Sequence, residues 1–363
     1  MAGPLSGLTI VEMAGLGPGP FAAMMLADHG ARVIRIERPG SLAVPNDPLT
    51  RSRESIALDL RQEEAREIVR KLAESADGLI EGYRPGVMER LNLGPDELLK
   101  SNPNLIYGRV TGWGQTGPLA REAGHDINYL ALTGLLSTIG EADRPPVPPL
   151  NLVADYGGGG LMLAFGMVSA LLHVQRGGQG QVIDAAMADG AALCGALIYG
   201  LRAAGAWQDL RGANLLDGGE PLYACYRSAD GKELALGAIE PQFRAALLNG
   251  LGLSGSPTKA QVAEAIAQRT RNEWVELFRG TDACVAPVLS LAEAPSYPHN
   301  RERGTFVDIG GVVQPAPAPR YSETPSGRPR PPRPAGEDGA AILEEFGYEA
   351  DAIAELRGKG VLL

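Results

Sequence analysis

The first half of the chain alternates short apolar runs with helical segments, and this alternation restricts the possible folds more than any other feature. The apolar runs, rich in aliphatic and β-branched residues, lie at 8–12, 33–36, 56–60, 79–80, 105–107 and 181–184. Helices are expected at 21–28, 62–74 and 160–174, followed by a helical region at 191–206. Strands separated by crossover helices pair in parallel, so we predict an α/β fold with a doubly wound parallel sheet.

The pattern changes near Leu222, where we expect a smaller α+β domain. Two predicted strands, at 223–227 and 232–237, flank the turn Asp230-Gly231. Helices are then expected near 241–251, 259–268 and 272–279. A run from Pro315 to Pro334 is typical of a stiff, extended linker, and it precedes two short predicted helices at 338–346 and 349–358.

Composition narrows the function class. The net charge of −10 argues against nucleic-acid binding and against binding to anionic membranes. The stretch 157–174 is apolar, but it contains five glycines and barely reaches the length of a membrane span, so a core helix is expected. Three dispersed cysteines, Cys194, Cys225 and Cys284, form no C-x-x-C pair, which favours a reducing compartment and a cytoplasmic enzyme.

Two segments place an ionisable side chain beside glycine and ahead of an apolar helical stretch. They are Gly124-His125-Asp126 and the run from Asn151 through Asp155 into four glycines at 157–160. Helix starts favour developing negative charge, because their backbone N–H groups are free. Asp155 alone is better explained as a helix N-cap. His125 is a poor cap, however, so the pair points to acid/base chemistry on a substrate that becomes an anion.

A glycine-rich turn, Gly15-Leu16-Gly17-Pro18-Gly19-Pro20, follows the first predicted strand and precedes a helix. This context resembles a dinucleotide-binding fingerprint. Pro18 lacks an N–H that a pyrophosphate would need, and Pro20 stands at the last glycine position. The turn therefore argues against a nicotinamide or flavin cofactor and is compatible with another nucleotide-like ligand.

Arginines gather in the region where strands of the predicted sheet end. They are Arg35, Arg38, Arg51, Arg53, Arg84 and Arg90. Each alone is best explained as ordinary surface charge. Together, in an acidic protein, they indicate a ligand that carries several phosphates, because guanidinium groups bind phosphate oxygens in pairs.

Several motifs of the chain resemble the family III CoA-transferase superfamily. They are LSGLTIVE at 5–12, GLGPGP at 15–20, ADHGARVIRIERPG at 27–40, IALDL at 56–60, EGYRPGV at 81–87, YGRVTGWGQTGP at 107–118 and GQVIDAAM at 180–187. GHDINY at 124–129 and RGANLLDGG at 211–219 are similar to the branch of racemases that act on 2-methylacyl-CoA thioesters, and AIEPQF at 238–243 falls within the wider match. The resemblance covers almost the whole chain.

The resemblance implies a Rossmann-like large domain that binds coenzyme A thioesters, within a homodimer of interlocked chains. The active site then lies between the large domain and the small domain of the partner. The expected parts are a large domain at 1–190, linker helices at 191–221, a small domain at 222–312, and a proline-rich linker with helices returning to the large domain at 313–363.

The resemblance also implies roles for particular residues. The catalytic residues are expected to be His125, Asp155 and Glu240; without the resemblance, Glu240 would be assigned to the surface. Asp126, Asn151 and Asn214 are expected near the site, and the contacts to CoA are expected from Arg38, Arg84, Arg90, Leu58 and Asp59. The loop Thr50-Arg51-Ser52-Arg53 departs from the family pattern, in which Asn-Arg and a nearby lysine are frequent, so its phosphate contacts stay open.

A racemase must remove the proton beside a thioester carbonyl and return one to the opposite face. It therefore needs two bases and stabilisation of an enolate oxygen, for which we expect backbone N–H groups near Asp126. No metal or redox cofactor is expected, since CoA enters as part of the substrate. Two alternatives remain: a CoA-transferase in which Asp155 is a nucleophile, and a non-catalytic acyl-CoA-binding protein. His125 argues against the first and the His125, Asp155 and Glu240 trio against the second.

Overall fold

The computed structural model describes residues 3–38 and 47–363, which form two compact units. The first unit contains Met1–Thr133, Leu150–Cys194 and Gly304–Leu363, and the second contains Gly134–Pro149 and Gly195–Arg303. The second unit is therefore inserted into the first. This division differs from the predicted one, because residues 134–149 and 195–221 belong with the second unit and residues 304–312 with the first.

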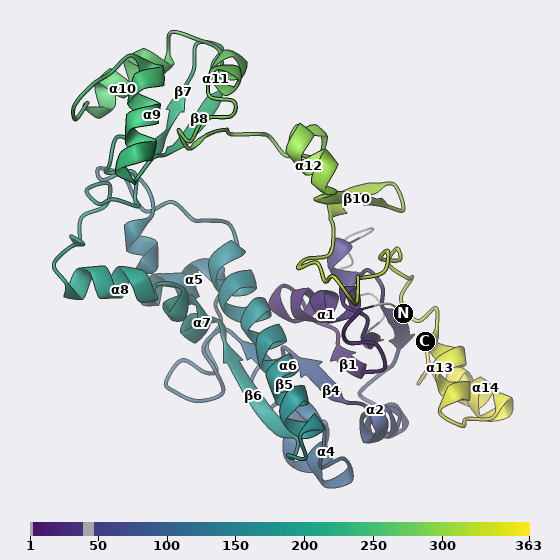
Figure 1. Ribbon diagram of the computed structural model, residues 1–363. Coiled ribbons are helices and arrows are strands. Elements are labelled where there is room, and N and C mark those ends of the chain that lie inside the picture. Colours follow the sequence, from purple (N-terminus) through teal and green to yellow (C-terminus); the bar gives the residue numbers. More distant parts are fainter. Residues whose placement is uncertain (1–2, 39–46) are drawn as a thin grey trace. The chain divides into compact units, whose positions relative to one another are not determined.

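A six-stranded sheet forms the centre of the first unit (Figure 1). Its strands are β1 (Thr9–Met13), β2 (Arg32–Glu37), β3 (Glu54–Ala57), β4 (Gly78–Glu81), β5 (Ile106–Thr111) and β6 (Gln181–Ala186). All neighbours pair in parallel in the order β3-β2-β1-β4-β5-β6. This is the Rossmann order, in which ligands bind outside the carboxyl ends of the strands where the order reverses. The predicted α/β fold is confirmed, and the reversal lies between β1 and β4.

Helices cover both faces of this sheet. One face shares an apolar core with α2 (Glu63–Ser75), α4 (Pro95–Ser101), α13 (Gly339–Glu345) and α14 (Ala350–Gly358). The other face carries α1 (Pro18–Asp28), α6 (Met162–Gln175) and α7 (Met187–Cys194). Two glycines let α6 approach closely, since a Cβ atom on Gly78 or Gly108 would lie 2.6 or 2.7 Å from the side chain of Met167. Three short helices, η1 (Pro48–Thr50), α3 (Val87–Arg90) and α5 (Asp126–Leu132), lie in connections.

The C-terminal segment completes the β3 edge of the sheet. The backbone N–H of Asp338 donates to Ser55, and that of Leu363 donates to Ala57. Leu58 forms an isolated bridge with Leu362. The predicted strand at 56–60 ends at Ala57. Leu58 still donates to the carbonyl of Glu37 in β2, whereas Asp59 donates to Val361 of the C-terminal segment.

A π-helix, η3 (Leu152–Leu161), runs directly into α6 and was not predicted from the sequence. Its glycines permit close packing: a Cβ atom on Gly158 would lie 2.5 Å from the backbone of Ala191, and one on Gly160 would lie 2.8 Å from that of Pro18. The continuous helix Leu152–Gln175 is long and apolar enough to cross a membrane by length and composition alone, and 44% of its most apolar window is buried. Both core helices and membrane spans meet that description, so the length and composition of this helix do not distinguish between the two.

The second unit is built on the antiparallel sheet β7 (Tyr223–Arg227), β8 (Glu233–Gly237) and β9 (Val285–Pro287). Its helices are η2 (Leu135–Thr138), α8 (Ala196–Ala203), α9 (Pro241–Leu251), α10 (Lys259–Ile266), α11 (Arg271–Leu277), η4 (Ala294–Ser296) and α12 (Pro298–Arg303). The expected α+β character is confirmed. A hairpin of β10 (Phe306–Ile309) and β11 (Val312–Pro315) belongs to the first unit and was missed, although Gly310-Gly311 is a hairpin-turn signal.

Candidate active site

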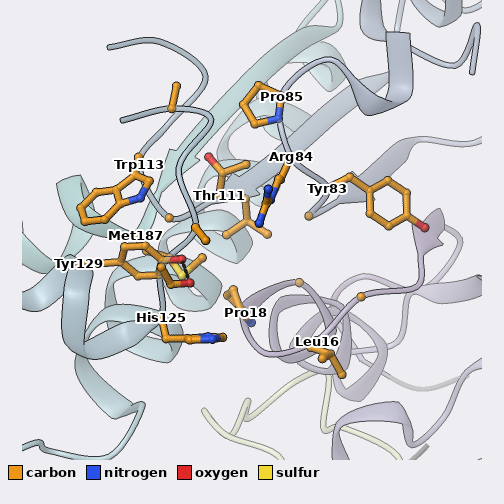
Figure 2. A pocket seen from close by; sticks show the side chains of 18 of the residues that line it. Leu16, Pro18, Tyr83, Arg84, Pro85, Thr111, Trp113, His125, Tyr129 and Met187 are labelled. Carbon is orange, nitrogen blue, oxygen red and sulfur yellow. Dashed lines mark hydrogen bonds between the residues drawn. The ribbon is translucent and has the colours of Figure 1, made fainter. Parts of the chain in front are cut away.

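A cavity of about 410 Å³ opens in the first unit where β1, β4 and β5 end. The turn after β1 contributes Leu16 and Pro18, the loop after β4 contributes Arg84, and the segment before α5 contributes His125. Figure 2 shows His125 and Arg84 reaching toward this cavity from different loops. The cavity therefore lies where the strand order reverses, as expected for a ligand site of this fold.

His125 is the N-cap residue of α5 and is exposed to the cavity. Its backbone is held in place, because its N–H donates to Oδ1 of Asn128 (3.1 Å) and the hydroxyl of Tyr129 donates to the carbonyl of Gly124. The Tyr129 ring packs edge-on against Trp113, with ring centroids 4.7 Å apart. A Cβ atom on Gly124 would lie 2.6 Å from that ring, so glycine is required before His125.

Asp155 lies half-buried in the first turn of η3, behind the turn after β1. The backbone N–H groups of Ala154 and Asp155 donate to Oδ2 of Asp126, at 2.8 and 2.7 Å. Nδ2 of Asn151 lies 3.5 Å from Oδ2 of Asp155. Burial raises the pKa of the Asp155 carboxyl, and the charge of Asp126 raises it further, while Asn151 and His125 act in the opposite direction. A carboxylate with a raised pKa is a stronger base than an ordinary one.

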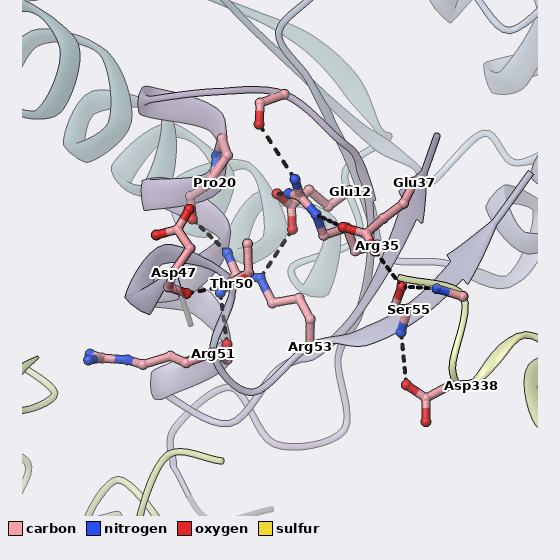
Figure 3. A network of polar contacts seen from close by, with 12 residues as sticks. Glu12, Pro20, Arg35, Glu37, Asp47, Thr50, Arg51, Arg53, Ser55 and Asp338 are labelled. Carbon is pink, nitrogen blue, oxygen red and sulfur yellow. Dashed lines mark hydrogen bonds and ion pairs between the residues drawn. The ribbon is translucent and has the colours of Figure 1, made fainter. Parts of the chain in front are cut away.

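Three of the clustered arginines are buried in ion pairs within the protein, and Figure 3 shows the contacts of two of them, Arg35 and Arg53. Arg35 and Arg53 both pair with the fully buried Glu12, and Arg53 also donates to the carbonyl of Pro20 (2.6 Å). Arg51 pairs with Asp28 and donates to the carbonyl of Pro315 (2.7 Å). These guanidinium groups are therefore engaged in holding the strand ends and the C-terminal segment, so the predicted phosphate cluster does not extend to them.

The other three arginines are exposed, and no ion pair engages Arg38, Arg84 or Arg90 within residues 3–38 and 47–363. A buried network fixes the loop that carries Arg84. Glu81 accepts hydrogen bonds from the backbone N–H of Tyr83 and from Nε of Arg109, both at 2.7 Å. Of the predicted CoA contacts, Arg84 is the one that lines the cavity. Its guanidinium group is therefore available to an anionic ligand there.

The remaining predicted residues occupy different environments. Leu58 is buried, and its backbone pairs with Glu37 of β2 and with Leu362. Asp59 accepts hydrogen bonds from the Arg61 guanidinium, which holds its pKa well below the usual range. The amide of Asn214 is fully engaged inside its own loop, where it bonds Gln208, Leu210 and Asp217. Glu240 is the exposed N-cap residue of α9 in the second unit. The roles assigned to these residues stay predictions.

Sequence reasoning missed the residues that shape the cavity wall. Thr111, Trp113 and Tyr129 line the cavity. Two of their buried polar atoms, Oγ1 of Thr111 and Nε1 of Trp113, have no hydrogen-bond partner among the described residues. Such atoms are candidates to bond a ligand or water. The one signal in the sequence was a pair of glycines, Gly112 and Gly124, which leave room for the Tyr129 ring.

Among the residues that the structure describes, no group of three or more His, Cys, Asp or Glu side chains could hold a metal ion. The functional groups brought together at the cavity are a histidine, an exposed arginine and, behind the glycine-rich turn, a carboxylate with a raised pKa.

The chain belongs to CoA-transferase family III, whose family model matches residues 5–339. A crystal structure of a CaiB/BaiF family protein from Brucella suis superposes with a TM-score of 0.81 at 28% identity, covering 95% of this chain and 100% of that one. Within the family, the chain is 45% identical to alpha-methylacyl-CoA racemase from mouse, over 99% of this chain and 97% of the relative. The human alpha-methylacyl-CoA racemase is equally similar, at 45% identity and the same coverage. The predicted family resemblance is confirmed.

Proposed function

We propose that this protein is a racemase that interconverts (R)- and (S)-2-methylacyl-CoA thioesters. The observation that carries the proposal is the electrostatic interaction between His125, at the cavity, and the half-buried Asp155, in a chain 45% identical to two alpha-methylacyl-CoA racemases. Proton-transfer groups of two kinds on one site suit a reaction that needs a base and an acid at once.

In the proposed reaction, one base removes the proton from the α-carbon. The electrons of the broken C–H bond move into the thioester, which becomes an enolate with its charge on the carbonyl oxygen. Backbone N–H groups near Asp126 stabilise this oxygen, and a single donor of that kind typically contributes about 3 kcal/mol. The protonated form of the other residue then delivers a proton to the opposite face. His125 serves one face and Asp155 the other, and no metal or redox cofactor takes part.

Coenzyme A forms part of the substrate and is bound in this proposal by Arg84, with Arg38 and Arg90 as further cationic contacts. Support comes from the exposure of all three guanidinium groups. Glu240 accepts a hydrogen bond from the imidazole of His125, which fixes the tautomer of that ring. Glu240 lies in the second unit, and the family resemblance implies a site shared with the small domain of the partner, so we assign this contact to a second copy of the chain.

A homodimer of intertwined chains is therefore part of the proposal. The helix α6 supports it, because Phe165, Val168 and Leu172 recur at helical spacing along one side and are 71%, 40% and 45% exposed. The neighbouring strand β6 is the open edge of the sheet, and its Val182 is also exposed. Exposed apolar side chains that recur along one side of a helix are typical of a protein interface.

The alternative is a CoA-transferase in which the Asp155 carboxylate attacks the thioester, forms a mixed anhydride and releases the CoA thiolate. The family to which the chain belongs favours keeping this candidate. His125 favours the racemase, since a nucleophilic carboxylate needs no second base at the α-carbon.

The test is incubation of each enantiomer of 2-methylacyl-CoA in deuterated water, without an acceptor acid. The racemase is expected to introduce deuterium at the α-carbon of both enantiomers and to converge on a near-equal mixture. A transferase would leave the configuration unchanged and would trap Asp155 as a covalent adduct that hydroxylamine converts to a hydroxamate. That second result would overturn the proposal.

A further inference from the structure

The side chain of Asp126 joins the two segments that carry the proposed bases. Asp126 follows His125 directly in the sequence, but its carboxylate contacts η3, where it accepts the N–H groups of Ala154 and Asp155. The residue is 4% exposed. A buried carboxylate that accepts two backbone N–H groups holds them more firmly than a neutral acceptor would, because charge-assisted hydrogen bonds are roughly twice as strong.

These two N–H groups need an outside acceptor. They lie in the first turn of η3, where the backbone N–H groups have no partner within their own helix. The side chain of Asn151, the N-cap residue, makes no capping hydrogen bond. The Asp126 carboxylate therefore caps η3, and without it the first turn that carries Asp155 would lose both of its anchors.

His125 does not depend on this carboxylate in the same way. Its backbone is fixed by Asn128 through the N–H of His125 and by Tyr129 through the carbonyl of Gly124. Neither contact involves the Asp126 side chain. Removing that carboxylate should therefore disturb the segment of Asp155 while the segment of His125 keeps its hydrogen bonds.

The charge of Asp126 acts on the same target. Its second oxygen, Oδ1, is buried and has no hydrogen-bond partner in the described part of the chain. The carboxylate lies close enough to Asp155 to raise the pKa of that group, in addition to the larger effect of burial. The like charge therefore strengthens Asp155 as a base while the two hydrogen bonds hold it in place.

We propose that Asp126 is a positioning residue that holds Asp155, and not His125, against the face of the substrate it serves. The inference rests on the proposed racemase function and deepens it, since the bases on the two faces of the substrate are then held in place by different residues.

The test measures deuterium uptake without inversion, separately for the two enantiomers, because one base can remove and return a proton on its own face. Asp155→Ala and His125→Ala first identify which enantiomer each base serves. Asp126→Ala should then reproduce the pattern of Asp155→Ala: uptake falls at least about tenfold for that enantiomer, part of the 10²–10⁴-fold typical of general acid/base catalysis. Deuterium uptake into the enantiomer served by His125 should stay within about threefold of wild type, which is small compared with the loss of a general acid/base.

Two further variants guard against a simple loss of folding. Asp126→Asn keeps an oxygen that can accept both N–H groups, so it should retain more of the selective uptake than Asp126→Ala. Asp77→Ala is the matched control, because Oδ2 of Asp77 accepts the N–H of Thr9 (2.7 Å) where β4 begins, at the other end of the strands. It should change uptake for neither enantiomer selectively.

Equal loss for both enantiomers in Asp126→Ala, or no loss for either, would overturn the inference. Failure of the proposed function looks different, since wild-type protein would then take up no deuterium into either enantiomer.

Discussion

Gly17 and the carboxylate of Asp155 are in near contact: a Cβ atom built on Gly17 would lie 3.4 Å from Oδ2 of Asp155. Gly17 caps α1 with a φ of 69° and a ψ of −117°, a conformation that glycine adopts readily and residues with a Cβ atom do not. Glycine is therefore favoured at position 17 for two reasons: the backbone conformation of the turn and the carboxylate that lies against it. These two requirements explain why the turn resembles a dinucleotide-binding turn.

Gly17→Ala should lower activity and stability together. The positive φ strains the turn, and because the added methyl group would touch the Asp155 carboxylate, a shift of the turn would move the base. A displaced base can cost on the order of 10²-fold in rate. Gly7→Ala is the control, because Gly7 also has a positive φ, of 93°, but has no atom within 4 Å of a built Cβ. Steady-state racemisation and thermal unfolding would check both variants. Equal activity in the two variants would contradict the proposed contact.

Asp155→Asn should abolish racemisation but stabilise the fold at neutral pH. Burial raises the pKa of the folded-state carboxyl above its ordinary value of 3.8, so ionisation favours the unfolded state. That cost is absent below pH 3.8, develops as the pH rises to the folded-state pKa, and persists above it. The gain in unfolding free energy should therefore shrink as the pH falls toward 3.8. A gain that does not depend on pH would contradict this origin.

Arg84→Glu should raise KM for acyl-CoA much more than it lowers kcat. Phosphate binding is largely equal in the ground and transition states, so its loss weakens substrate binding with little effect on the chemical step. Added salt should narrow the difference between variant and wild type. Lys100→Glu, at an exposed position on α4, controls for the change in net charge and should leave KM unchanged. An unaltered KM in Arg84→Glu would remove this residue from the CoA site.

Arg53→Leu should be strongly destabilising. Glu12 is completely buried and pairs with Arg53 and Arg35, and removing one partner of a buried ion pair typically costs about 3–5 kcal/mol. Arg61→Leu, which breaks an exposed pair with Asp59, should have little effect on unfolding. Urea denaturation compares the two. Similar midpoints would show that the buried network adds no more than a surface pair.

Phe165→Glu should separate the proposed dimer. A charge in the middle of the exposed apolar side of α6 would have to be desolvated when the interface forms. Sedimentation velocity should show a smaller species, and activity should fall with it, because the proposed site takes Glu240 from the second copy. Leu291→Glu changes an isolated leucine that is 95% exposed and should leave the assembly intact. A dimer that survives Phe165→Glu would locate the interface elsewhere.

The sequence was most informative where one local pattern decides the structure. Alternating apolar runs predicted the parallel strands, and β7 matches its predicted range. Prediction failed where distant segments meet. The local sequence does not indicate that Leu58 pairs with Leu362 or that Gly158 contacts α7. Nor does it indicate that two arginines form buried ion pairs with Glu12. The arginine cluster was overestimated for the same reason, since acidic partners far away in the chain neutralise half of it.

The insertion of the second unit has a consequence for synthesis on the ribosome. The segment from Gly304 onward, which closes the β3 edge of the sheet, emerges only after the entire second unit. Until then β3 presents unpaired backbone groups to solvent, and edge strands of this kind readily pair with other chains. The second unit can fold during this time, whereas the sheet of the first unit still lacks the segment that covers β3. Slow translation through residues 195–303 would therefore lengthen the period in which the nascent chain is open to aggregation.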